Sequence, residues 1–198
     1  MRYKIIVILA LYQIMLTLFS WIVSSAMPSL PIKSVLSAEG ARWFFGGFVD
    51  NMSSPLLVWL VLCAIAYGSF QNSGMKKLFH RKHTQKKMSY RQRHAAFMAI
   101  ALLCVITAIV IMLAFVPHAV LLGVSGNLYP SAFSAAAIPI MAFTITFISI
   151  IYGIVSGSYD NTNNAVKSLY AGFSAFAPLF PIYILAMQLY KTITFVFL

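Results

Sequence analysis

Residues 95–116 read AAFMAIALLCVITAIVIMLAFV, a run without a single charged side chain. An α-helix rises about 1.5 Å per residue, so this run is long enough to cross the roughly 30 Å hydrocarbon core of a bilayer. The stretch just before it, residues 74–94, is rich in Lys and Arg. An apolar run of this length beside a group of cations is typical of a transmembrane helix whose basic end stays in the cytoplasm.

The rest of the chain has the same apolar character. Of its 198 residues, 61% are hydrophobic and 9% are charged, and the mean hydropathy is +0.88. A soluble domain of this length cannot bury so much apolar surface, so lipid must cover the excess. We predict an all-α integral membrane protein, a single membrane domain over residues 1–198, with about five transmembrane helices and one interfacial or re-entrant helix. The predicted spans are 5–27, 55–70, 95–116, 133–155 and 165–191.

The first apolar run follows Arg2 and Lys4, which is also how a secretory signal peptide begins. However, the run is longer than the apolar core of a signal peptide, and Ser24-Ser25-Ala26 is only a weak cleavage site. We therefore interpret it as a membrane anchor, with a signal peptide as the alternative.

Residues 34–50 show a different pattern, in which apolar side chains at helical spacing share the stretch with Glu39, Arg42 and Asp50. A helix with one apolar and one charged face prefers the membrane–water interface, where Trp43 would lie among the lipid headgroups. We predict an interfacial helix over 34–50. A re-entrant helix that faces a substrate is the alternative.

The distribution of charge predicts the orientation. The formal net charge is +11, and eight of the fourteen Lys and Arg residues lie in the basic loop, residues 74–94: Lys76, Lys77, Arg81, Lys82, Lys86, Lys87, Arg91 and Arg93. Because Lys and Arg accumulate in cytoplasmic loops, we place this loop and the N-terminus in the cytoplasm of a bacterium and, after five crossings of the inner membrane, the C-terminus outside. The basic loop would also bind anionic lipid headgroups. Nucleic acid is not an expected partner, because the loop has few aromatic side chains to stack on bases.

Acidic residues are nearly absent from the chain. There are three, Glu39, Asp50 and Asp160, and none falls inside a predicted span. The sequence therefore contains no pair of carboxylates for acid–base catalysis. Cys63 and Cys104 each lie alone within an apolar run, where a cysteine is usually a small buried hydrophobic residue. We predict no catalytic residue, no cofactor and no metal site, and we do not expect an enzyme.

Polar side chains inside the apolar runs are the candidates for ligand binding, because hydrocarbon penalises them. The last run contains Pro178 and Pro181, which remove backbone donors and predict a broken helix. Gln188, beyond this break, is the strongest candidate; the alternative is that its amide only bonds a neighbouring helix. The predicted substrate-binding residues are Asn51, Ser54, Thr144, Thr146, Ser149 and Gln188.

Two parts of the chain resemble one known family. The first consists of VLSAEGARW at 35–43, then Asn51, Pro55-Leu56 and NSGM at 72–75. The second consists of PSAF at 130–133, IYGIVSG at 151–157 and AMQL at 186–189. In this order they resemble the p-aminobenzoyl-glutamate transporter (AbgT) family. The resemblance implies a dimeric, transporter-like scaffold for p-aminobenzoyl-glutamate or related organic anions.

The chain is much shorter than members of that family, and it lacks their central and C-terminal core segments. Two hypotheses follow from the resemblance. The chain is either a reduced transporter whose site is completed in a homodimer or by a partner membrane subunit, or a membrane scaffold or accessory subunit that does not transport.

Reporter fusions test the predicted topology. A reporter fused after Leu198 should be active on the outer side of the membrane, and one inserted near Gln85 should be active in the cytoplasm. A cytoplasmic C-terminus would contradict the five crossings.

Overall fold

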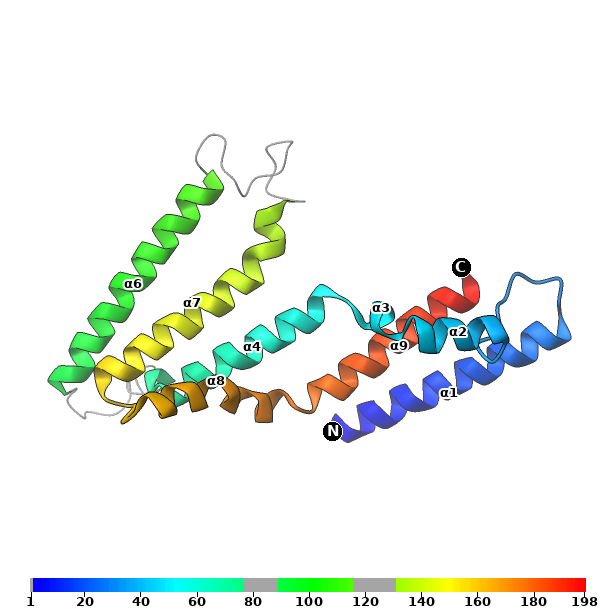
Figure 1. Cartoon of the computed structure of the whole chain (residues 1–198), viewed down its shortest axis with the longest axis horizontal. Helices are drawn as coiled ribbons and strands as arrows, with labels where there is room; N and C mark the ends of the chain where they lie inside the picture. Colours follow the sequence, from blue (N-terminus) through cyan, green and yellow to red (C-terminus); the bar gives the residue numbers. More distant parts are fainter. Residues whose placement is uncertain (1, 77–88, 116–130) are drawn as a thin grey trace. The chain divides into compact units, whose positions relative to one another are not determined.

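The computed structural model describes residues 2–76, 89–115 and 131–198, and in these ranges the chain forms eight α-helices and no strand (Figure 1). The chain divides into two compact units. Unit 1 comprises Met1–Leu57 and Phe176–Leu198, and unit 2 comprises Val58–Ala175. Most of the basic loop, and residues 116–130 between the third and fourth predicted spans, lie outside the described residues.

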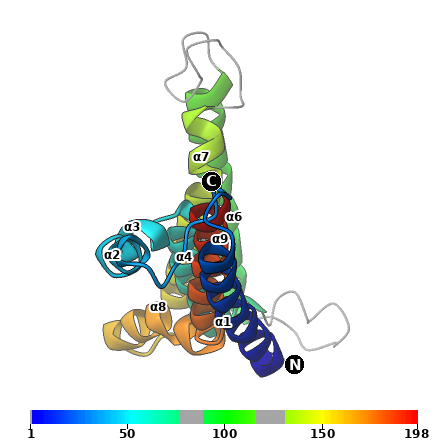
Figure 2. The ribbon, with the colours of Figure 1, turned by 90° about the vertical axis from the view of Figure 1, so that its right-hand side faces the viewer.

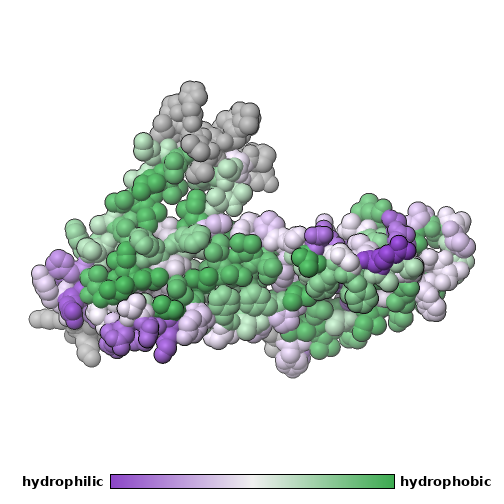
Figure 3. All heavy atoms as spheres, viewed as in Figure 1, coloured by the Kyte–Doolittle hydropathy of each residue, from purple (hydrophilic) through white to green (hydrophobic). Residues whose placement is uncertain are grey.

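Five of the described helices are long and apolar enough to cross a membrane. Large hydrophobic side chains are exposed along them, and Figure 3 shows these surfaces in green. The prediction of an all-α integral membrane protein with five spanning helices is therefore confirmed. The five helices are α1 (Arg2–Ala26), α4 (Pro55–Asn72), α6 (Tyr90–Phe115), α7 (Ala132–Ser156) and α9 (Leu179–Phe197).

Unit 1 is built on the contact between α1 and α9, which lie side by side and run in the same direction (Figures 1 and 2). After α1 the chain turns back, and the backbone N–H of Lys33 donates to the carbonyl of Val196 near the end of α9 (3.2 Å). Two parallel neighbouring helices cross a bilayer in the same sense, which agrees with an odd number of crossings from α1 to α9.

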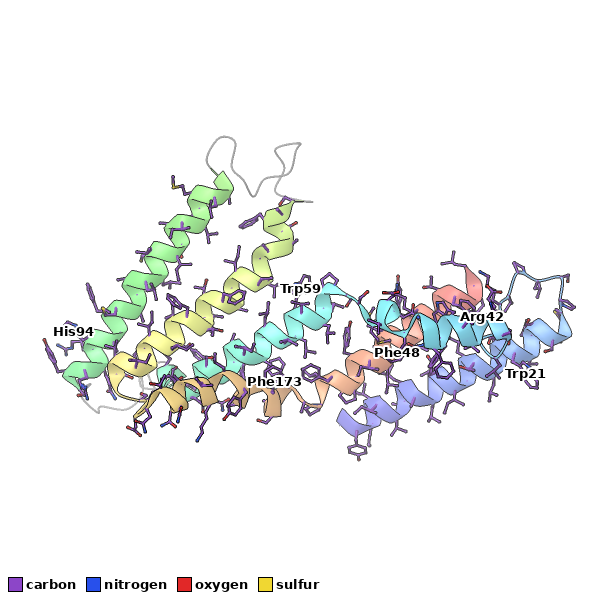
Figure 4. The ribbon with its side chains drawn as sticks, in the orientation of Figure 1. Trp21, Arg42, Phe48, Trp59, His94 and Phe173 are labelled. Atoms are coloured by element: carbon purple, nitrogen blue, oxygen red, sulfur yellow. The ribbon has the colours of Figure 1, made fainter. Side chains whose placement is uncertain are left out.

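The predicted helix over 34–50 is two short helices, α2 (Ala38–Gly46) and α3 (Phe48–Met52). The hydroxyl of Ser37 caps α2 by accepting from the backbone N–H of Gly40 (3.0 Å). The ring of Trp43 stacks on Phe195 of α9 with the ring centroids 4.4 Å apart, so α2 packs on α9. Figure 4 shows Arg42 on α2 at the same end of unit 1 as Trp21 of α1.

Unit 2 contains the pair α6 and α7, which pack through a small core of Ala95, Ala99, Ile148 and Tyr152. A capping box fixes the start of α7, because the side chains of Ser131 and Ser134 each bond the other residue's backbone N–H. The helix ends at Gly157, whose φ of 73° is left-handed and favours glycine.

The fifth predicted span, 165–191, is in the structure two helices, α8 (Thr162–Phe176) and α9. Pro178 occupies the N-cap of α9 and Pro181 lies in its first turn, where a missing backbone donor costs little. The predicted break is therefore present, and the spanning helix lies later in the chain than predicted, at Leu179–Phe197.

In unit 2, α4 and α8 touch backbone to backbone at two glycines. A Cβ atom on Gly172 would collide with the carbonyl oxygen of Ala64, and one on Gly68 would collide with the backbone nitrogen of Gly172. Ser168, one turn before Gly172, is also buried in this contact. Small residues allow such close approach between membrane helices, so van der Waals contact along the backbones holds α8 against α4.

Replacement of Gly172 by Ala should therefore destabilise the protein, because neither backbone can move away from the added methyl group without separating the helices. We expect a loss of about 1–3 kcal/mol, as for other overpacked cores, measured as a lower midpoint of thermal unfolding in detergent. Gly46→Ala is the control, because a Cβ there meets nothing within 4 Å. Equal midpoints for the two variants would contradict the contact.

Candidate functional site

Unit 1 contains a line of polar side chains between α1 and α9. The amide nitrogen Nε2 of Gln13 donates to the hydroxyl of Thr192 (2.9 Å), and that hydroxyl donates to the carbonyl of Gln188 one turn earlier (2.7 Å). Gln13 lies near the middle of α1, and Gln188 lies at the middle of α9. We call Gln13, Gln188 and Thr192 the amide seam. Its two amides thus lie near the midpoints of helices that are long and apolar enough to cross a membrane.

Three atoms of the amide seam have no hydrogen-bond partner among the described residues. They are Oε1 of Gln13 and both amide atoms of Gln188, and all three are shielded from solvent. The Gln188 side chain is only 4% exposed. An unpaired buried polar atom costs about 1–3 kcal/mol, and such atoms in native proteins usually have a water, ion or ligand partner. The amide seam therefore has unused capacity both to donate and to accept hydrogen bonds.

A cavity of about 410 Å³ lies beside Gln13, between α1 and the segment that leads into α2. Thr17 is on the α1 side, and Phe44 and Phe45 are on the α2 side. Most of the wall is apolar, and few polar groups interrupt it, as in sites for small organic molecules. Gln188 does not line this cavity; it lies on the α9 side of the amide seam.

Two of the predicted site residues, Asn51 and Ser54, lie near α9 in the same unit. The hydroxyl of Ser54 is 2.8 Å from the hydroxyl of Tyr183, which donates to the carbonyl of Met52 (2.5 Å). Asn51 is 7% exposed, and its Nδ2 has no partner among the described residues. Ser54 is thus engaged in a structural contact, whereas Asn51 keeps a free buried donor.

The three predicted site residues on α7, Thr144, Thr146 and Ser149, belong to unit 2. The hydroxyls of Thr144 and Thr146 donate to carbonyls of their own helix, one turn back. Ser149 is fully buried and donates to the sulfur of Met75 (3.6 Å). Thr144 and Ser149 line a cavity of about 420 Å³ whose wall is almost wholly apolar. This cavity offers little to a polar ligand.

Sequence reasoning missed Gln13, Thr192 and Tyr183. Gln13 had a visible signal, because it is an amide in the middle of an apolar run. Thr192 follows Gln188 by four residues and so lies on the same helix face, which was also a usable signal.

Comparison of this chain with protein-family models, with curated proteins and with solved structures finds no match. The resemblance to the AbgT family stays a prediction from the sequence motifs.

The unpaired amide makes a prediction about stability. Gln188→Leu should leave the unfolding midpoint of the ligand-free protein unchanged or raise it, because an unpaired polar group is replaced by an apolar one of similar size. Gln13→Leu should be less favourable than Gln188→Leu by about 1 kcal/mol, because it also loses the bond to Thr192. Thermal unfolding in the same detergent measures both. A marked loss for Gln188→Leu would indicate a packing role.

Proposed function

We propose that this chain is a transporter-like protein of the bacterial inner membrane that binds a small organic anion at the amide seam and moves it across the bilayer. The observation that carries the proposal is the pair of amides with unused hydrogen-bonding atoms, Gln13 and Gln188, at the midpoints of two adjacent apolar helices. Transporters of several folds bind their substrates near the bilayer midplane, often beside a broken helix, and α8 and α9 are separated by such a break.

Neutral amides suit this role. The Nε2 of Gln188 can donate to a carboxylate, and the Oε1 atoms of Gln13 and Gln188 can accept from an amine or amide of the substrate. A Lys or Arg at the same depth costs about 2.5–3.5 kcal/mol to insert, so an amide gives polar recognition at a lower cost. The motif resemblance adds the substrate class: p-aminobenzoyl-glutamate or a related organic anion.

The proposed arrangement in the membrane follows from the charge distribution. The basic loop lies in the cytoplasm beside anionic lipid headgroups, the N-terminus is cytoplasmic, and the C-terminus is outside. A second copy of the chain, or a partner membrane subunit, covers the apolar faces and supplies the remaining walls of the substrate path.

A membrane scaffold or accessory subunit is the second candidate, and one observation favours it. None of the three acids of the chain, Glu39, Asp50 and Asp160, lies in the five apolar helices. Coupling of transport to a proton or sodium ion commonly uses a carboxylate at membrane depth. A chain without one would need a partner to supply it.

Uptake of labelled p-aminobenzoyl-glutamate into proteoliposomes tests the proposal. Wild-type protein should give flux above empty vesicles, and Gln188→Leu should reduce the flux per folded molecule at least tenfold, since it removes about 1.5–3 kcal/mol of hydrogen bonding to a charged group. Thr194→Val is the matched control, because Thr194 is only partly buried on α9 and its hydroxyl bonds only its own helix among the described residues. Absence of flux with wild-type protein would contradict transport, and equal flux in the two variants would contradict substrate binding by Gln188. Either result would favour the scaffold role.

A further inference from the structure

A polar cavity of about 370 Å³ lies in unit 2 at the end of the helices where the basic loop begins. It is an open cavity lined by the last turn of α4, the turn between α7 and α8, and one face of α8. The side chains of its wall that can form hydrogen bonds are Asn72, Ser158, Tyr159, Asn164, Lys167, Ser168 and Tyr170.

The charge around this cavity favours an anion. The described part of unit 2 contains four Lys and Arg residues, Lys76, Arg91, Arg93 and Lys167, against the single acid Asp160. Lys167 makes no ion pair and no hydrogen bond to another described residue, so its ammonium group is available to a ligand. Figure 3 shows hydrophilic surface gathered at this end of the unit.

Tyr159 adds a neutral donor. Its ring lies against Gly153, where even a Cβ atom would collide with it, so the ring is fixed. Its hydroxyl interacts with the side chain of Ser168 and is 3.4 Å from the carbonyl of Ser69, a long hydrogen bond that a better acceptor can replace. Burial raises the pKa of this hydroxyl, so it keeps its proton near neutral pH.

The position of the cavity identifies the kind of ligand. It lies where the apolar helices α4 and α7 end, with tyrosine hydroxyls in its wall, as is typical of the membrane–water interface. The two helices that flank this turn also expose apolar side chains, among them Ile154 of α7 and Val166 of α8. A molecule with an anionic head and an apolar tail matches both surfaces.

We infer that this cavity binds the phosphate of an anionic phospholipid, with Lys167 pairing with the phosphate and Tyr159 donating a hydrogen bond to it. The site is separate from the amide seam and does not depend on transport. It also differs from the general electrostatic attraction of anionic lipids to the basic loop, because here one lipid molecule binds at one position through a defined pair of side chains.

Native mass spectrometry of the full chain in mild detergent, titrated with phosphatidylglycerol or phosphatidylcholine, tests the inference. The wild-type protein should bind one phosphatidylglycerol more tightly than further copies, and more tightly than phosphatidylcholine. Lys167→Gln should weaken that first binding event by about fivefold or more, which is the effect of one cation near an anionic headgroup. Lys167→Arg should retain it, and Tyr159→Phe should weaken it while leaving the ring in place.

Arg93→Gln is the matched control, because Arg93 is exposed on α6 at the same end of unit 2 and does not line the cavity. We expect it to change the affinity less than twofold. Equal effects of Lys167→Gln and Arg93→Gln would overturn the inference, since they would indicate a diffuse basic surface. Displacement of the lipid by inorganic phosphate at a similar concentration would overturn the lipid assignment, because the tail would then contribute nothing.

Discussion

A polar side chain inside hydrocarbon has no water to bond, so each one must find a partner in the protein or in a ligand. In unit 1 this constraint acts on two helices at once. Gln13 on α1 satisfies its amide nitrogen through Thr192 on α9, and that bond links two helices that are each long and apolar enough to cross a membrane. The remaining amide atoms of Gln13 and Gln188 stay unpaired among the described residues, which makes the same contact both a structural link and a candidate site.

The sequence allowed the number of spanning helices to be predicted, because length and apolarity are local properties, although the fifth helix begins later than predicted. It also singled out Gln188, because a polar residue within an apolar run is visible without tertiary information. The partner of Gln13 could not be predicted in this way, since Thr192 is 179 residues away and is adjacent only because α1 packs on α9. Such a pairing depends on which faces of the two helices pack together, and a single sequence does not show which faces these are.

The threonines also show that tertiary contacts cannot be predicted from one sequence. Thr144, Thr146 and Thr192 each donate to a carbonyl of their own helix, and in sequence they are equivalent polar residues within apolar runs. A hydroxyl that donates can still accept, so what separates them is whether a donor arrives from another helix. For Thr192 the donor is Gln13. The predicted role of Thr144 and Thr146 therefore depends on a neighbour that the described part of unit 2 does not provide.

The two candidate sites differ in chemistry in a way that follows from their depth. A cation is costly at the bilayer midplane and cheap at its boundary, where water and headgroups solvate it. Accordingly the amide seam of unit 1 holds neutral groups at the middle of α1 and α9, whereas Lys167 lies at the end of the helices of unit 2. An anion at the boundary can thus be held by charge, but an anion at the midplane can be held only by hydrogen bonds from amides. Recognition there depends on how well those few donors are placed, and the unpaired Nε2 of Gln188 is the donor in the amide seam that remains available.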